Sequence, residues 1–466
     1  MNDKERTENY REHLANVTQE GKRIWLYPRT IKGKLYRYRE VLSYLLLAFL
    51  FAGPFLKIGG QPLLLLNVVE RKFVFFGKPF WPQDFYILAF VMITAVLFVV
   101  LFTVIFGRVW CGWTCPQTIF MEMVFRRIEN LIEGNAKKQR KLDAMPWNAE
   151  KIFKKSLKHT VFFLISFAIA NTFLAYIIGS DALMDIITDP PSEHITGLIS
   201  ILIFTTVFYL VFAKLRELVC IMICPYGRLQ GVMLDENSVV VAYDHKRGEP
   251  RGKIRKSENQ EAKGDCVDCR LCVDVCPTGI DIRNGTQLEC VNCTACIDAC
   301  NQVMEKIDKP KGLIRFDSKN NIEEEKGFRY TSRIKTYLVI LGLLLVGLVA
   351  LVGTRKSVQS NIYRTAGMMP TVNDSLVTNY YNLELINKTF EAIDFKIDPV
   401  NEDVKIIIPG EMHTLAGGQV NKFVFLLQME KSKVNSFSLK VPIDLYINGK
   451  KSRTLETVFL GPFSAN

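Results

Sequence analysis

The stretch Cys266-Val-Asp-Cys269-Arg-Leu-Cys272-Val-Asp-Val-Cys276-Pro277 is followed by a second, similar run, Cys290-Val-Asn-Cys293-Thr-Ala-Cys296-Ile-Asp-Ala-Cys300. Three closely spaced thiolates can surround one face of a cubane, while the fourth cysteine of each run binds the other cluster in two-cluster ferredoxins. The spacing therefore predicts a bacterial ferredoxin-like α+β domain with two [4Fe–4S] clusters. We expect one cluster on Cys266, Cys269, Cys272 and Cys300, and the second on Cys276, Cys290, Cys293 and Cys296.

Zinc is the alternative metal for these eight cysteines, because paired C-x2-C elements also form zinc sites. Zinc motifs do not require a third cysteine two residues later, nor a Cys-Pro pair such as Cys276-Pro277. The pattern therefore favours iron. Cys300 is followed by Asn301 instead of proline, but proline only shapes the backbone there, so we expect ligation to survive.

Outside this block the chain is rich in long apolar stretches. Mean hydropathy is +0.13 although 23% of the 466 residues are charged. A membrane-spanning helix needs about 20 apolar residues. Five segments approach or reach that length, and we predict a five-span helical bundle: residues 41–57, 86–107, 160–179, 196–213 and 337–353. We find no N-terminal signal peptide pattern.

The distribution of charge predicts the orientation of the spans. The net charge is +12, and Lys and Arg are concentrated before the first span and between the second and third. Between the third and fourth spans there are only acidic charges, Asp181, Asp185, Asp189 and Glu193. Cytoplasmic loops are the basic ones, so we expect a cytoplasmic N-terminus and an external C-terminus. Because the orientation of the spans in the lipid membrane already explains the basic clusters, we expect no nucleic-acid partner.

After the fifth span the sequence changes to short segments rich in β-branched and aromatic residues. Asn448-Gly449 is a strong signal for a two-residue hairpin. These features predict a C-terminal β-sandwich, with a small barrel as the alternative. The predicted organisation is a basic tail (1–40), four spans (41–235), a linker with the ferredoxin domain (236–335, core 264–304), the fifth span (336–354) and the sandwich (358–466).

The remaining four cysteines form a repeated motif at the inner ends of two spans. The two copies are Cys111-Gly-Trp-Thr-Cys115-Pro116 and Cys220-Ile-Met-Ile-Cys224-Pro225. Proline disfavours helical geometry in the preceding residue and suits the first position of a helix. We therefore expect Cys115 and Cys224 at helix N-termini, where the helix dipole favours the thiolate.

These four thiols, at one depth of the cytoplasmic interface, have three possible roles. Soft thiolates, with Met121, Met123 and Met222 nearby, suit copper(I). The thiols could also form a dithiol–disulfide redox centre, or pack as small apolar residues. We expect a redox or metal role for the thiols and simple packing for the methionines. The sequence contains no nucleotide-binding loop, catalytic triad or haem attachment motif, so an unidentified donor must supply electrons.

Three longer runs resemble the FixG/RdxA/CcoG family of bacterial cytochrome c oxidase accessory proteins: residues 110–118, 224–235 and 243–252. The resemblance implies an immunoglobulin-like external C-terminal domain and a place in the bacterial inner membrane. It also implies reduction of Cu(II) to Cu(I) for assembly of cbb-type cytochrome c oxidase, with the oxidase and its copper-delivery proteins as partners. The copper-facing or relay thiols would be Cys111, Cys115, Cys220 and Cys224.

Copper as the substrate rests on this resemblance alone. Two other functions fit the same motifs. One is a quinol-linked electron conduit, as in the polyferredoxins of periplasmic reductases. The other is a non-enzymatic assembly scaffold or copper carrier whose sandwich binds the oxidase.

Overall fold

The computed structural model describes residues 16–461 except 19, 21, 69–71, 82–83, 254–262, 326, 328–330, 374, 409–413 and 435. The chain divides into two compact units. One comprises Met1–Leu56 and Ala89–Leu348, and the other comprises Lys57–Leu88 and Val349–Asn466. The first unit therefore contains the cysteine-rich block together with most of the spans. The division differs from the predicted boundaries, because residues 57–88 group with the C-terminal domain.

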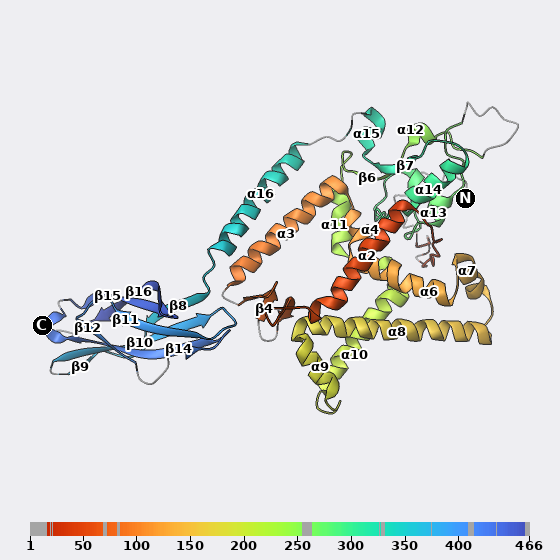
Figure 1. The fold of residues 1–466 in the computed structure, drawn as a ribbon. Coiled ribbons are helices and arrows are strands. Elements are labelled where there is room, and N and C mark those ends of the chain that lie inside the picture. Colours follow the sequence, from red (N-terminus) through yellow and green to blue (C-terminus); the bar gives the residue numbers. More distant parts are fainter. Residues whose placement is uncertain are drawn as a thin grey trace. The chain divides into compact units, whose positions relative to one another are not determined.

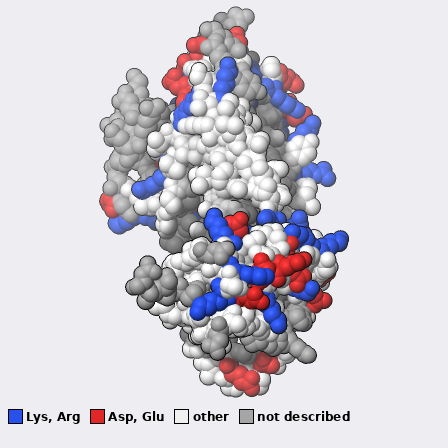
Figure 2. Space-filling model, turned by 90° about the vertical axis from the view of Figure 1, so that its left-hand side faces the viewer, with Lys and Arg blue, Asp and Glu red and all other residues white. Residues whose placement is uncertain are grey.

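Five helices are long and apolar enough to cross a membrane, as predicted (Figure 1): Lys34–Phe55 (α2 with η1), Phe85–Phe106 (α3), Ala149–Ile178 (α8), Ile195–Leu215 (α10 with η4) and Ser332–Gly353 (α16). Their exposed side chains include Ile93 and Val349. Figure 2 shows a broad surface without charged side chains on one face of the molecule. The chain is a multi-pass membrane protein.

Several of these helices begin before the predicted apolar segment. α8 starts at Ala149, where the Asn148 side chain accepts a hydrogen bond from the backbone N–H of Lys151. A side-chain cap of this kind starts a helix irrespective of hydropathy. The charged first turns of α8 were therefore invisible to a search for apolar residues.

The other helical elements of the first unit connect the spans and build the cysteine-rich block. They are α4 (Val109–Trp113), α5 (Pro116–Ile119), the π-helical segments η3 (Phe120–Phe125) and η5 (Val219–Ile223), α6 (Arg126–Ile132), α7 (Ala136–Ala144), α9 (Ser180–Thr188), α11 (Pro225–Met233), α12 (His245–Gly248), α13 (Leu271–Asp274), η7 (Ile282–Asn284), α14 (Ala295–Lys306) and α15 (Lys319–Glu324). A two-stranded antiparallel sheet, β6 (Val240–Tyr243) with β7 (Ile314–Asp317), completes this block.

Aromatic packing joins the spans of the first unit. The ring of Phe125 stacks on Phe212 at a centroid distance of 4.6 Å, and it meets Phe162 edge to face at 4.9 Å. All three rings are fully buried. Aromatic pairs of this geometry stabilise a core by about 0.5–1.5 kcal/mol beyond the area they bury.

A buried ion network lies beside this aromatic core. The Glu129 carboxylate accepts from Arg216 at 2.7 Å and from Lys158 at 3.3 Å. Burial opposes ionisation of Glu129, but Arg216 and Lys158 outweigh it and lower its pKa to about 2. The carboxylate therefore stays ionised where an isolated buried acid would be neutral.

The cysteine-rich block packs on the start of α2. The Asp298 carboxylate in α14 accepts from the backbone N–H groups of Tyr36 at 2.8 Å and Leu35 at 3.4 Å. The first N–H groups of a helix have no partner within it. Asp298 supplies one from a different part of the chain and thereby ties the block to the first span.

The second unit contains a two-sheet sandwich, in agreement with the prediction and not with the barrel alternative. One sheet has the order β12-β14-β10-β8, with β9 paired to β10, and the other has the order β13-β11-β15-β16. The strands are β8 (Val358–Arg364), β9 (Thr371–Val372), β10 (Leu376–Asn387), β11 (Ile393–Pro399), β12 (Val404–Ile407), β13 (Thr414–Leu415), β14 (Val420–Glu430), β15 (Ser438–Ile447) and β16 (Lys450–Leu460), with a short helix η8 (Lys431–Lys433).

The predicted hairpin joins β15 and β16. Ile447 pairs with Lys450, and the two turn residues Asn448 and Gly449 have φ of 46° and 76°. Positive φ at both central positions defines the tight turn that Asn-Gly favours. The prediction is confirmed.

The connection between the first two spans, residues 58–85, has a mixed composition from which we expect a loop, but it contains short strands: β1 (Lys57–Ile58), β2 (Gln61–Pro62), β3 (Leu64–Asn67), β4 (Lys72–Phe75) and β5 (Lys78–Phe80). After them comes Asp84, whose fully buried carboxylate pairs with Arg355 at 2.8 Å and also with Lys388. Burial opposes ionisation of Asp84, but both cations lower its pKa. This ion triad joins three separate segments of the second unit.

Candidate metal centres

The first predicted ligand set faces one cavity. Cys266, Cys269, Cys272 and Cys300 all line it, together with apolar side chains such as Leu313 and Ile314. Arg283 also lines the cavity and is held by ion pairs to Asp268 at 2.6 Å and Asp281 at 2.7 Å. Four thiols from two distant parts of the sequence thus meet around a largely apolar space.

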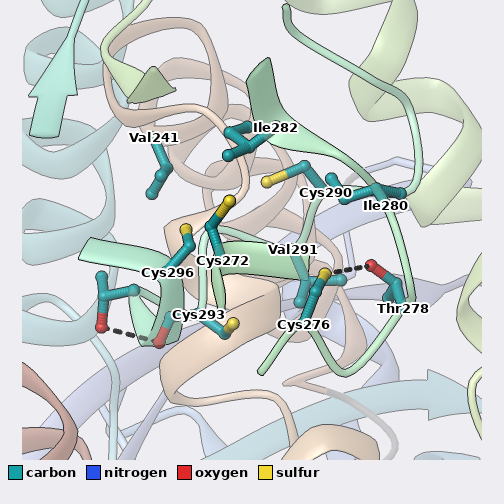
Figure 3. A pocket seen from close by; sticks show the side chains of 11 residues that line it. Val241, Cys272, Cys276, Thr278, Ile280, Ile282, Cys290, Val291, Cys293 and Cys296 are labelled. Carbon is teal, nitrogen blue, oxygen red and sulfur yellow. Dashed lines mark hydrogen bonds between the residues drawn. The ribbon is translucent and has the colours of Figure 1, made fainter. Parts of the chain in front are cut away.

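The second predicted set faces a neighbouring cavity. In Figure 3 the sulfur atoms of Cys276, Cys290, Cys293 and Cys296 surround this space. The Cys276 sulfur lies 3.3 Å from the Thr278 hydroxyl. Cys272 lines both cavities, so the two sites are direct neighbours.

The backbone explains how each short loop turns its thiols inward. Asp268 and Arg270 have φ of 50° and 57°, and the equivalent residues of the second run, Asn292 and Thr294, have φ of 52° and 66°. Positive φ is uncommon for residues other than glycine. Its repetition at matching positions shows that the two runs are a structural repeat, built to wrap around an enclosed group.

The chemistry of both cavities fits a thiolate-bound cluster. Burial raises the pKa of Cys272 and Cys290 to about 12, so these thiols would stay protonated without a metal. Iron ligation requires the thiolate, and a metal cation supplies the charge that stabilises it. Four cysteines in an apolar shell are the ligand set of a [4Fe–4S] cluster.

The two membrane-edge motifs adopt the predicted backbone geometry. Cys111 lies in α4, and Cys115 is extended (ψ 125°) before Pro116 opens α5. Cys220 lies in η5, and Cys224 is likewise extended (ψ 113°) before Pro225 opens α11. The motifs are therefore repeated in structure as well as in sequence.

The two motifs converge on one place. The Cys111 thiol donates to the Gln230 side-chain oxygen at 3.1 Å, and the same oxygen accepts from Arg108 at 2.9 Å. Burial raises the pKa of Cys111 to about 11, opposed by Arg108, and raises that of Cys220 to about 12. The charge of Cys224 contributes to both increases. The contacts of Gln230 bring α11, the helix that directly follows Cys224, against Cys111. The four cysteines of the two motifs are called here the edge quartet.

The methionines near the edge quartet differ in their surroundings. Met121 lies in the same apolar cluster as Phe120 and Phe125, Met123 is buried, and the Met222 side chain is 48% exposed. Arg108 and Gln230, by contrast, touch the thiols and were not singled out from the sequence. Their only sequence signal is position, directly after the second span and one turn beyond Pro225.

The edge quartet packs directly on the second cysteine cavity. Cys111 and Cys293 belong to one contiguous buried cluster. A Cβ added to Gly112 would lie 2.3 Å from the carbonyl oxygen of Val291, a residue that lines the second cavity. Only a residue without a side chain permits this approach.

Comparison with known proteins places these features in a family. A family model described as a 4Fe-4S dicluster domain matches residues 215–319, and one described as a 4Fe-4S binding domain matches residues 88–138. A third model, described as an IG-like fold at the C-terminal of FixG, matches residues 348–462. Iron–sulfur clusters and the immunoglobulin-like sandwich are thus shared with known proteins.

Curated relatives cover most of the chain. Protein RdxB of Cereibacter sphaeroides is 34% identical over 86% of this chain and 87% of its own length. Protein RdxA of the same organism is 33% identical over 80% of this chain and 81% of its own length. The nitrogen fixation protein FixG of Rhizobium meliloti is 38% identical over 63% of this chain and 57% of its own length. The chain belongs to the FixG/RdxA family of iron–sulfur electron-transfer membrane proteins.

Proposed function

We propose that this protein is a cupric reductase, which converts Cu(II) to Cu(I) for the assembly of cbb-type cytochrome c oxidase. The observation that carries the proposal is the unbroken packing from the two cysteine cavities to the edge quartet. The copper step and the oxidase partner come from the resemblance to the accessory-protein family.

The reaction needs one electron for each copper ion. When bound by the eight cysteines of the two cavities, the clusters supply one-electron redox chemistry. Around them the chain provides apolar walls, exemplified by Ile280 and Leu313, which exclude water. At the membrane edge, the half-buried thiols of Cys115, Cys220 and Cys224 are soft ligands that prefer Cu(I) to harder cations. They either contact copper or lie on the route to it.

The proposal includes an orientation in the bacterial inner membrane. Basic loops mark the cytoplasmic side, which puts the N-terminus and the ferredoxin domain in the cytoplasm and the sandwich in the periplasm. The sandwich would then be available to the oxidase and its copper-delivery proteins. A protease added to intact spheroplasts should cleave the sandwich and spare the cysteine-rich block.

The direct test is copper reduction by the purified protein, reduced chemically and freed of excess reductant. Formation of Cu(I) is followed with a Cu(I)-specific chelator in the wild type and in Cys115→Ser and Cys224→Ser. Met222→Ala is the matched control, because Met222 lies within the second motif and is exposed. We expect stoichiometric Cu(I) formation, limited by the electrons stored in the reduced protein, in the wild type and control, and its loss in both cysteine variants.

Two results would contradict the proposal. Unchanged Cu(I) formation in the cysteine variants would remove the edge quartet from the copper route. No copper reduction by the wild type would leave the quinol-linked conduit and the assembly scaffold. Quinol oxidation by the same preparation then separates these two.

A further inference from the structure

The edge quartet has the composition of a complete ligand set. Each of two equivalent motifs contributes one cysteine from a helical turn and one from an extended N-cap position. A Cβ added to Gly227 would lie 2.4 Å from the backbone oxygen of Cys220 and 3.1 Å from the Arg108 guanidinium. Arg108 and the Cys111 thiol share the Gln230 side-chain oxygen, so the two motifs meet around Arg108.

A single metal ion requires sulfur atoms close together. With a metal–sulfur bond of about 2.3 Å, the sulfurs of a three- or four-thiolate site lie about 4 Å apart. In the described part of the chain, which includes all twelve cysteines, no three cysteine sulfurs lie within 4.8 Å of one another. This holds for the edge quartet and equally for the two ferredoxin quartets. In this respect the edge quartet resembles the two cluster-binding sets, and none of the three quartets is gathered around the position of a single ion.

The family models divide the cysteines of the edge quartet between two matches. The 4Fe-4S binding model over residues 88–138 includes Cys111 and Cys115. The dicluster model over residues 215–319 includes Cys220 and Cys224 in addition to the eight cysteines that two clusters need. Each match therefore contains one half of a third four-cysteine set, and neither contains the whole.

The surroundings suit an anionic group bound by four thiolates. Arg108 is buried (3% exposed), and a Cβ added to Gly227, three residues after Cys224, would lie 3.1 Å from its guanidinium. Gln230, fully buried, links the Arg108 guanidinium to the Cys111 thiol. A buried cation beside the thiolates offsets part of the cost of taking their negative charge out of water.

We propose that Cys111, Cys115, Cys220 and Cys224 together bind a third [4Fe–4S] cluster at the membrane edge. The three sites then form a continuous series, because Cys272 borders the first two cavities and Cys111 packs with Cys293 of the second. The third site lies beyond what the two ferredoxin motifs account for. It does not depend on copper being the substrate.

Iron and acid-labile sulfide in the anaerobically purified full-length protein test this proposal. Three cubanes require about twelve iron atoms per chain, and two require about eight. We expect about twelve in the wild type and in Met222→Ala. The double variant Cys111→Ser/Cys220→Ser should lose about a third of both elements while the electron paramagnetic resonance signals of the two ferredoxin clusters remain.

A second double variant, Cys115→Ser/Cys224→Ser, guards against a folding defect caused by one particular pair. Thermal unfolding of each variant, compared with Met222→Ala, identifies any general loss of structure. About eight irons in the wild type, or equal iron in wild type and folded variants, would overturn the proposal. So would stoichiometric copper at the quartet with iron at eight. Because copper turnover is measured separately, failure of the proposed function would leave this result unaffected.

Discussion

The indole N–H of Trp113 donates to the backbone carbonyl of Asn292, at a nitrogen–oxygen distance of 3.3 Å. Trp113 lies between the two cysteines of the first edge motif, and Asn292 lies between two cysteines of the second ferredoxin run. Asn292 is buried and has positive φ. The bond therefore fixes the edge motif to a loop whose backbone already has an uncommon conformation.

Replacing Trp113 with Phe removes the donor and keeps most of the ring. A buried hydrogen bond contributes about 0.5–1.5 kcal/mol, so we expect a fall of about 1 kcal/mol in the free energy of unfolding. Denaturant unfolding in detergent measures it. Trp147→Phe is the matched control, since Trp147 is 73% exposed. Equal stability of the two variants would show that the bond contributes nothing.

Gly112→Ala places a methyl group against backbone. The added Cβ would lie 2.3 Å from the Val291 carbonyl oxygen, and such overpacking costs about 1–3 kcal/mol. We expect a lower unfolding midpoint and faster proteolysis of the cysteine-rich block. Gly197→Ala, in α10 with open space around the Cβ, should be neutral. A Gly112→Ala protein as stable as this control would contradict the close docking.

The ion network of Glu129 makes stability depend on pH in a defined direction. The carboxyl of an unfolded chain takes up a proton near pH 4.5, whereas folded Glu129 does so at about 2. The unfolded state therefore binds more protons between these values, and stability falls as the pH is lowered through this window. The difference in unfolding free energy between wild type and Glu129→Gln should shrink over the same range. If the difference in unfolding free energy stayed constant with pH, the ionisation of Glu129 would not be the cause of the pH dependence.

Asp84→Asn breaks the ion triad of the second unit. It leaves Arg355 and Lys388, both largely buried, without their shared carboxylate. Removing one partner of a buried ion pair destabilises a protein by about 3–5 kcal/mol. We expect the unfolding midpoint of the sandwich to fall. Thermal unfolding followed by far-ultraviolet circular dichroism measures this midpoint.

Asp398→Asn provides the comparison for this change. Asp398 pairs with Lys396 on the surface, where both side chains are well exposed. Surface pairs contribute about 0–1 kcal/mol, so this variant should unfold close to the wild type. Similar losses in both variants would mean that burial of the triad has no energetic consequence.

The features predicted correctly from the sequence are those with a local signal. Spans have length and hydropathy, the Asn448-Gly449 turn has its dipeptide, and the Pro116 helix start has its proline. The roles of Arg108 and Gln230 have no such signal. They become visible only when residues from the second span and from α11 meet, separated by 122 positions in the chain.

The short strands between Lys57 and Phe80 have no clear sequence signal for a related reason. They are two to four residues long, which is too short for an alternating pattern to emerge. The contact of Gly112 with Val291 depends on a fold-wide approach of two backbones, and a glycine in a sequence does not identify its neighbour. Local patterns therefore located the thiols, and only the tertiary structure grouped them.

The assembly of the edge quartet also depends on how the chain is inserted into the membrane. Two complete spans, α8 and α10, separate Cys115 from Cys220. Two crossings return the chain to the side it left, so the two motifs share one side of the bilayer when both of these spans cross it. If only one of the two spans crossed the membrane, the second motif would lie on the opposite side of the bilayer. Correct insertion of both spans is thus a precondition for the four thiols to meet. A group bound by all four thiols would therefore report that the chain was inserted correctly.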